Sequence, residues 1–212
     1  MDSQARLVSG LGAFLCRPPT PRELDAFSKY LALLVEWNRV YSLTGYREPA
    51  RIIDKLFLDS LLFLRFLPTS TSALLDLGSG TGIPGIPLKI IKPAYRLTLI
   101  EARRRRGSFL LAAVRGLSLE GVKVLTGRAE SLIQDSPSLE GQFDAVVTRA
   151  SGRVELIAPV ALRFLKPGGR FIASGPPLAK PVVGSSTPGA WQSVISPVSG
   201  LGRRFLVVEK IV

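Results

Sequence analysis

The sequence contains no histidine and only one cysteine, Cys16, in 212 residues. Without histidine there is no Ser-His-Asp triad, no Cys-His pair and no histidine general base. A zinc site of cysteine and histidine needs several such ligands, and a disulfide within one chain needs two cysteines. We therefore expect no metal site, and any catalysis must use other groups.

Acidic residues are also scarce, with 16 Asp and Glu against 28 Lys and Arg, which gives a formal net charge of +12. Such an excess of cations attracts polyanions such as RNA, DNA or an anionic membrane face. Long apolar runs are lacking too, since the most apolar stretch, Leu56–Leu67, contains Asp59 and Arg65 and is too short to span a bilayer. The first residues, Met1–Gln4, carry an acid where a signal peptide has bases. We expect a cytoplasmic monomer that does not enter a membrane.

The first 70 residues have helical patterns. Thr20 before Pro21, with Glu23 three residues later, predicts a helix start with a capping box. A break is expected at Ser42–Gly45, and a second helical stretch from Pro49 to Leu67. We interpret residues 1–70 as a helical cap.

From Ala73 onward, short apolar runs alternate with helical patterns, which predicts an α/β fold with a parallel sheet covered on both faces. Strands are expected at Ala73–Leu77, Arg96–Ile100, Val122–Leu125, Phe143–Val147 and Arg170–Ala173, with helices at Pro84–Ile91, Arg104–Gly116 and Val154–Leu165. Lys166–Gly169 is expected to close the last helix, and 175–189 to form a loop. Two further runs, Trp191–Ile195 and Arg204–Val208, have no helix between them and should form an antiparallel pair at the sheet edge. Residues 71–212 would then be one unit with seven strands.

The most informative segment is the glycine-rich loop, Asp76–Gly85, between the first strand and the first helix of this unit. Its glycines let the backbone approach a ligand closely at a helix N-terminus. Glu101 ends the second strand, at the spacing of a carboxylate that accepts hydrogen bonds from a ribose.

Two ligands suit this arrangement, a nicotinamide or flavin dinucleotide and S-adenosylmethionine. S-adenosylmethionine is favoured because Asp76 precedes the glycines, where its carboxylate could hold the ligand's ammonium group, if necessary through water. Arg128–Glu130 follows the third strand, where backbone and a carboxylate could meet an adenine. A second βαβαβ half for a nicotinamide is also lacking.

Several segments together resemble the bacterial small-subunit rRNA guanine-N7 methyltransferases, a family formerly called glucose-inhibited division protein B. The similar segments are Trp37-Asn38, Tyr41–Thr44, Phe57–Leu61, Asp76–Leu88, Gly127–Glu130, Thr148–Ala150 and Phe205–Lys210. The resemblance implies a Rossmann-like class I methyltransferase fold that uses S-adenosylmethionine to methylate guanine N7 in 16S rRNA.

The resemblance also implies roles for particular residues. Gly78 and Ile83 would line the cofactor site, Ala129 and Glu130 would hold the adenine, and Arg149 would lie between cofactor and target base. With the residues proposed from the loop itself, the expected cofactor set is Asp76, Gly78, Ser79, Gly80, Thr81, Gly82, Ile83, Glu101, Ala129, Glu130 and Arg149. The expected RNA-binding set is Asn38, Lys55, Arg103, Arg104, Arg105, Arg106 and Arg128.

The chemistry of the bases agrees with guanine N7. This ring nitrogen carries a lone pair and no proton, so its methylation needs no general base. Arg149 could donate to guanine O6 or to a phosphate and orient the base. The run Arg103–Arg106 stands at a helix start, where cations oppose the helix dipole, which suggests that a bound anion such as RNA compensates them. Arg96, Arg115, Lys123 and Arg128 are expected to extend this run into a basic rim beside the cleft.

Two alternatives stay open at this point. One is an NAD-dependent oxidoreductase. The other is a non-catalytic RNA-binding member of the methyltransferase fold, because Leu56 and Ser174 stand where the family has His and Lys.

Overall fold

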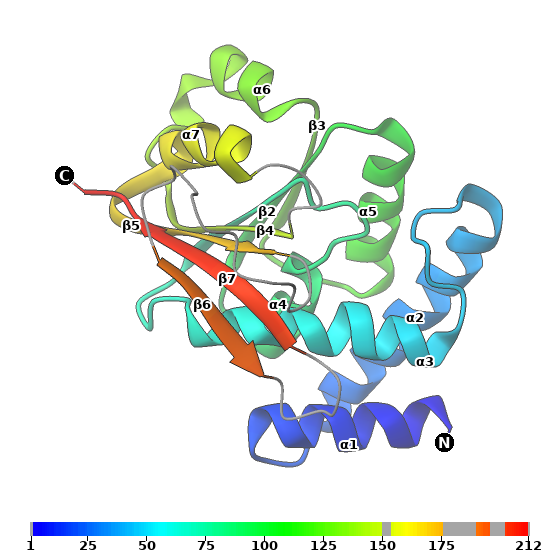
Figure 1. The fold of residues 1–212 in the computed structure, drawn as a ribbon. Helices are drawn as coiled ribbons and strands as arrows, with labels where there is room; N and C mark the ends of the chain where they lie inside the picture. Colours follow the sequence, from blue (N-terminus) through cyan, green and yellow to red (C-terminus); the bar gives the residue numbers. More distant parts are fainter. Residues whose placement is uncertain (1, 150–153, 176–189, 196–201, 212) are drawn as a thin grey trace.

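The centre of the computed structural model, which describes residues 2–149, 154–175, 190–195 and 202–211, is a seven-stranded sheet in the order β3-β2-β1-β4-β5-β7-β6 (Figure 1). The strands are β1 (Ala73–Leu77), β2 (Arg96–Glu101), β3 (Val122–Thr126), β4 (Phe143–Arg149), β5 (Leu165–Ser174), β6 (Ala190–Ile195) and β7 (Gly202–Glu209). Strands β1 to β5 are parallel, and β7 runs antiparallel to both β5 and β6. The mainly parallel sheet with an antiparallel edge pair is therefore confirmed.

The start of β5 differs from expectation. We expected Lys166–Gly169 to be a turn before the strand, but β5 already begins at Leu165, which pairs with Phe143. The register then shifts, and pairing resumes with Arg170 opposite Ala145. Gly168, at φ +74°, lies within this irregular stretch. The prediction was wrong because Pro and Gly signal a chain reversal and a bulge equally well.

Helical elements fill the chain before the sheet: α1 (Ser3–Leu15), α2 (Pro21–Tyr41), α3 (Pro49–Ile52), the π-helical η1 (Ile53–Leu58) and the 3₁₀-helical η2 (Leu61–Arg65). The capping box is confirmed, since the Glu23 amide donates to Thr20 Oγ1 at 3.2 Å and the Thr20 amide donates to a Glu23 carboxylate oxygen at 2.7 Å. Helix α2 ends at Tyr41, and its C-cap Ser42, with a φ of +49°, turns the chain out of the helix at the predicted break.

The remaining helices are α4 (Gly85–Ile91), α5 (Arg104–Gly116), α6 (Ala129–Asp135), η3 (Pro137–Leu139) and α7 (Val154–Phe164). Alternate strand residues divide the core in two. On one face, Leu74, Leu97 and Leu99 pack with α4, α5 and the N-terminal helices, and on the other, Leu75 and Leu77 pack with α6 and α7. Both faces are covered, as predicted. We did not predict α6, because its seven residues contain only two large apolar side chains, the adjacent Leu132 and Ile133, and so give no clear helical stripe.

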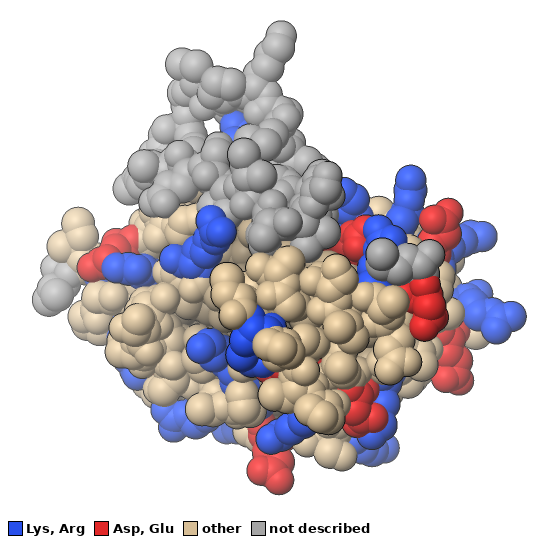
Figure 2. Space-filling view, turned by 90° about the horizontal axis from the view of Figure 1, so that it is seen from below, with Lys and Arg blue, Asp and Glu red and all other residues tan. Residues whose placement is uncertain are grey.

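On the face of the molecule that carries α1, charged residues of both signs are interspersed (Figure 2). Figure 2 views the molecule from the side of α1, and there Lys and Arg lie among uncharged residues and among Asp and Glu instead of forming one patch. Among the described residues, no helix combines the length and the apolar character needed to cross a bilayer.

Candidate functional site

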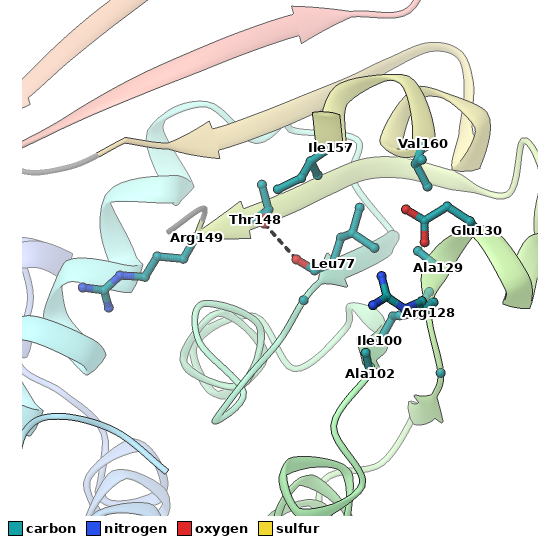
Figure 3. Close-up of a pocket in the computed structure, with 12 residues that line it drawn as sticks. Leu77, Ile100, Ala102, Arg128, Ala129, Glu130, Thr148, Arg149, Ile157 and Val160 are labelled. Carbon is teal, nitrogen blue, oxygen red and sulfur yellow. Dashed lines mark hydrogen bonds between the residues drawn. The ribbon is translucent and has the colours of Figure 1, made fainter. Parts of the chain in front are cut away.

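A cleft of about 350 Å³ lies at the carboxyl ends of β1, β2 and β4 (Figure 3). Its lining consists of Leu77, Gly78, Ile100, Ala102, Gly127, Arg128, Ala129, Glu130, Thr148, Arg149, Ile157 and Val160. The Thr148 hydroxyl donates to the Leu77 carbonyl at 2.8 Å and joins β4 to β1 at the base of the cleft. Ligands of open parallel sheets bind at this edge.

The glycine-rich loop forms one wall of the cleft through Gly78. The amides of Gly78 and Ser79 both donate to the Ile100 carbonyl at 2.9 Å, which fastens the loop to the end of β2. Gly78 has a φ of +73°, and a Cβ there would meet no atom within 4 Å. The missing side chain therefore leaves open space in the cleft, which is what a closely held ligand requires.

The other expected loop residues stand behind this wall. Ser79, Thr81, Gly82 and Ile83 are buried, Gly80 is half-buried, and none of these residues lines the cleft. They shape the turn that presents Gly78.

Glu101 joins the loop to the next helix. Its carboxylate accepts hydrogen bonds from the Gly80 amide and from the Arg103 amide, each at 2.8 Å. A carboxylate has further lone pairs, so these bonds leave capacity for ligand hydroxyls. Glu101 is buried and does not itself line the cleft, although its neighbours Ile100 and Ala102 do.

Asp76 is fully buried and does not line the cleft. Its Oδ2 accepts a hydrogen bond from the Gly85 amide at 2.8 Å, while Oδ1 is buried and has no hydrogen-bond partner among the residues that the structure describes. Burial raises the pKa of Asp76 to about 7, and the charge of Glu101 adds to this, although the Gly85 amide opposes it. The unpartnered oxygen fits a carboxylate that completes its bonding with a ligand's ammonium group through water.

The N-terminal helices touch the loop through Tyr30 of α2. The buried Tyr30 hydroxyl donates to the Thr81 carbonyl inside the loop, and its ring stacks on Phe57 with centroids 4.7 Å apart. Burial raises the pKa of Tyr30, and the nearby Asp76 raises it further, so the hydroxyl stays a donor. Sequence reasoning missed this residue, since a tyrosine on an apolar helix face gives only a packing signal.

We predict that Tyr30→Phe loosens the loop without opening the core. The ring packing is kept, but the Thr81 carbonyl loses its buried donor, which should cost about 1–3 kcal/mol of unfolding free energy. Chemical denaturation would measure this loss, and amide hydrogen exchange at residues 79–83 should accelerate more than exchange in β3. Uniform acceleration across both segments would contradict a local role in the loop.

Arg149 lies at the end of the cleft opposite Ala129 and Glu130. Figure 3 shows its side chain running from β4 away from those two residues. Its Nη2 lies 3.1 Å from Oδ2 of Asp59, a buried carboxylate that also binds Arg203. Burial lowers the pKa of Arg149, and Asp59 opposes this shift. Sequence reasoning gave Asp59 no role, although an acid inside the most apolar stretch of the chain signals a buried partner.

At the other end, Arg128, Ala129 and Glu130 surround the start of α6. Arg128 and Glu130 are exposed and Ala129 is buried, and all three line the cleft. The structure thus brings Gly78, Ala129, Glu130 and Arg149 together around one cavity, as the sequence suggested.

The residues expected to bind RNA differ in their exposure and in their hydrogen-bond partners. Arg103, Arg104 and Arg105 are exposed, whereas Arg106 is half-buried and donates weakly to the Leu43 carbonyl at 3.4 Å. Asn38 is buried, with its amide nitrogen bound to the Tyr46 carbonyl and its oxygen accepting from the Thr44 amide. Asn38 therefore supports the 42–46 turn instead of presenting its amide to solvent. Lys55 is half-buried and acts on Asp59.

The expected basic rim is wrong in part. Arg96 begins β2, and Lys123 is the second residue of β3, so both lie toward the amino ends of their strands, away from the cleft. Arg115 stands in the last turn of α5, at the far end from Arg104. Only Arg128 of the four lines the cleft. The prediction of the rim was wrong because the first and last residues of a strand lie at opposite ends of the sheet, however close they are in sequence.

Comparisons with known proteins agree with this geometry. The family model described as "GidB: rRNA small subunit methyltransferase G" matches residues 23–175. The chain is 39% identical over 155 residues to "Ribosomal RNA small subunit methyltransferase G" of Brevibacillus brevis, and 38% identical over 154 residues to the protein of that name from Streptococcus pyogenes serotype M12. These matches cover 73% and 72% of this chain and 65% of each relative, so the matched part spans less than two thirds of the relatives' length.

Solved structures show the same fold at low identity. Cofactor-bound Rv0187 from MTB is similar with a TM-score of 0.58 and 16% identity, over 92% of this chain and all of that one. Precorrin-6y C5,15-methyltransferase from Geobacter metallireducens is similar with a TM-score of 0.50 and 16% identity, over 81% of this chain and 92% of that one. The likeness confirms the Rossmann-like class I methyltransferase fold.

Proposed function

Because the chain belongs to the GidB family of rRNA small subunit methyltransferase G, we propose that it transfers a methyl group from S-adenosylmethionine to guanine N7 in small-subunit rRNA. The observation that carries this proposal is that the match over residues 23–175 includes the whole lining of the cleft, from Leu77 to Val160. Family membership leaves the oxidoreductase alternative without support.

The residues present fit S-adenosylmethionine. The open space at Gly78 and the unpartnered oxygen of Asp76 suit a closely held ligand with a cationic amino group. We propose that Glu101 accepts bonds from the ribose and that Ala129 and Glu130 hold the adenine. When bound, the cofactor supplies a methyl group activated on a sulfonium.

The protein's contribution to the reaction is orientation. Guanine N7 has no proton to lose, so no side chain needs to act as a base, and the absence of histidine from the sequence is no obstacle. We propose that Arg149, fixed by Asp59 at the edge of the cleft, orients the target nucleotide. The apolar side chains of Leu77, Ile157 and Val160 reduce the access of water to the cleft.

Two organisational proposals follow. We propose that residues 1–70 act as a helical cap on the cofactor-binding unit 71–212, with Tyr30 as one contact between them. We also propose that the chain acts as a monomer, which light scattering on the purified protein would test.

A direct test is incubation with labelled S-adenosylmethionine and small ribosomal subunits that lack the modification. Incorporation of label into 7-methylguanosine supports the proposal. RNA binding without incorporation would instead favour the non-catalytic alternative.

We predict that Arg104→Glu with Arg105→Glu weakens RNA binding and flattens its salt dependence. Both side chains are exposed at the start of α5, beside Glu101 and the loop. If each contacts a phosphate, the slope of log K against log salt should fall by about 2. The control is Arg115→Glu with Lys123→Glu, which changes the net charge equally but lies away from the cleft. Equal loss of slope in both pairs would contradict a localised RNA surface.

A further inference from the structure

Four charged side chains from three distant parts of the chain meet beside the cleft. Lys55 and Asp59 come from the helical segment before the sheet, Arg149 from the end of β4 and Arg203 from β7. Arg203 Nε lies 2.9 Å from Oδ1 and 2.8 Å from Oδ2 of Asp59, and Arg149 Nη2 lies 3.1 Å from Oδ2. Asp59 is 4% exposed, and Lys55 acts on the same carboxylate. Asp59 is thus the shared partner of three cations.

The cluster carries excess positive charge, since three cations face one carboxylate. Within the described part of the chain, the charged or titratable groups that act on Arg149 are Asp59, Arg203 and Tyr46, so Asp59 is the carboxylate that opposes it there. The segments 150–153, 176–189 and 196–201 contain no Asp or Glu in the sequence, so their side chains can supply no second carboxylate. Unbalanced charge at this depth is costly, which makes an anion from outside the chain a favourable addition.

Arg149 has a donor ready for such an anion. Its Nη1 is buried and, in the described part of the chain, has no hydrogen-bond partner. The other terminal nitrogen is held by Asp59, and the residue lines the cleft. A guanidinium fixed on one side and unpartnered on the other suits an oxyanion, because its planar donors match phosphate geometry.

We propose that this cluster is a phosphate site for the RNA strand that enters the cleft, with Arg149 as the contact and Asp59 as the positioning residue that holds Arg149 beside Arg203. The inference rests on the proposed function for its ligand, an RNA phosphodiester. Arg203 fixes Asp59 by binding both carboxylate oxygens, and its Nη1 is itself held by the Gly175 carbonyl at 3.3 Å.

Asp59→Asn gives the decisive test, because general electrostatics and the positioning role of Asp59 predict opposite changes in RNA affinity. The variant raises the formal net charge by one, so general electrostatics predicts tighter RNA binding. Loss of the positioning carboxylate instead predicts binding about tenfold weaker, with the slope of log K against log salt shallower by about 1. Filter binding of unmodified small ribosomal subunits across a salt series measures both. Melting temperature and the far-UV circular dichroism spectrum establish that the variant is folded.

Further variants test whether Asp59 acts through Arg149 and guard against misfolding of Asp59→Asn. Arg149→Met should cause the same loss, and combining it with Asp59→Asn should add nothing, because Asp59 acts through Arg149. If Asp59→Asn does not fold, Arg203→Lys takes its place, since it keeps the charge but loses the paired contact with Asp59. The matched control is Asp144→Asn, which removes another ion-paired carboxylate, bound to Lys166 near the amino end of β4, and should leave the slope unchanged.

The outcomes separate the two proposals. An unchanged or steeper slope in Asp59→Asn, or equal and additive losses in the double variant, overturns the phosphate site. If the phosphate site is overturned but the wild-type chain methylates rRNA, the proposed function stands without the phosphate site. If the slopes change as expected but no methyl group is transferred, the phosphate site stands and the methyltransferase proposal falls.

Discussion

Gly78→Leu should lower the affinity for S-adenosylmethionine at least 100-fold while the chain stays folded. The added side chain would occupy the open space at Gly78, inside the cleft, where a Cβ meets no atom within 4 Å. A 100-fold loss corresponds to about 3 kcal/mol of binding free energy. Isothermal titration calorimetry with S-adenosylmethionine measures the affinity directly.

The chain offers a closely matched control at Gly168. This glycine has a φ of +74°, against +73° at Gly78, and a Cβ there also meets nothing within 4 Å. Gly168→Leu therefore introduces the same backbone strain, about 1–2 kcal/mol, at the start of β5, away from the cleft. Cofactor affinity should be unchanged in Gly168→Leu. Equal losses in both variants would mean that strain, and not occupation of the cleft, is responsible.

Asp76→Asn should stabilise the fold at high pH and weaken cofactor binding. Burial raises the pKa of Asp76 to about 7, so the folded state holds the proton more tightly than the unfolded state, whose value is near 3.8. Stability contributed by this group therefore falls as the pH rises between these values and stays low above them. A shift of about three units corresponds to about 4 kcal/mol, which is the upper limit of the gain from removing the charge.

Urea denaturation at pH 5 and pH 8 tests the sign of the change in unfolding free energy that Asp76→Asn causes. Asp76→Asn should exceed the wild type in unfolding free energy at both pH values, and by clearly more at pH 8, because pH 5 lies only a little above the unfolded-state value near 3.8. Asp144→Asn is the opposite case: although burial opposes the shift, Lys166 and the amides of Ser72 and Ala73 hold the pKa of Asp144 below its usual range. That variant should lose stability at pH 8. A loss at pH 8 in Asp76→Asn as well would show that the ionised carboxylate supports the fold.

Asp76→Asn also tests whether the carboxylate of Asp76 serves the cofactor at the expense of stability. If the unpartnered Oδ1 serves the ligand's ammonium group, Asp76→Asn should bind S-adenosylmethionine more weakly even where it is more stable. A buried charge that costs stability is expected at a functional site.

Local signals in the sequence predicted much of the fold. The capping box of Thr20 and Glu23, the end of α2 near Ser42 and the continuous apolar strands depend on neighbouring residues, and the structure confirms them. The antiparallel pair β6 and β7 followed from the lack of room for a helix between them. By contrast, α6 has only seven residues, too few for a helical stripe to be recognised.

The site was predictable where a motif, a fixed spacing or the family resemblance connects its parts. Gly78 and Glu101 follow from a loop motif and a fixed spacing. Asp59 and Arg203 lie 144 positions apart, and no periodicity relates them. Their contact arises because β7 lies beside β5 in the sheet and brings the end of the chain next to the helical segment. The prediction that Arg96 and Lys123 lie beside the cleft was wrong for the same reason, because the end of the sheet at which a residue lies is decided only when the strands assemble.

The most direct test of the account is to map methylated nucleotides in small-subunit rRNA from cells with and without this protein. We expect one 7-methylguanosine that is present with the wild-type chain, absent without it, and not restored by Gly78→Leu. Identical modification maps in the presence and absence of the protein, or a new methyl group on another atom, would contradict it.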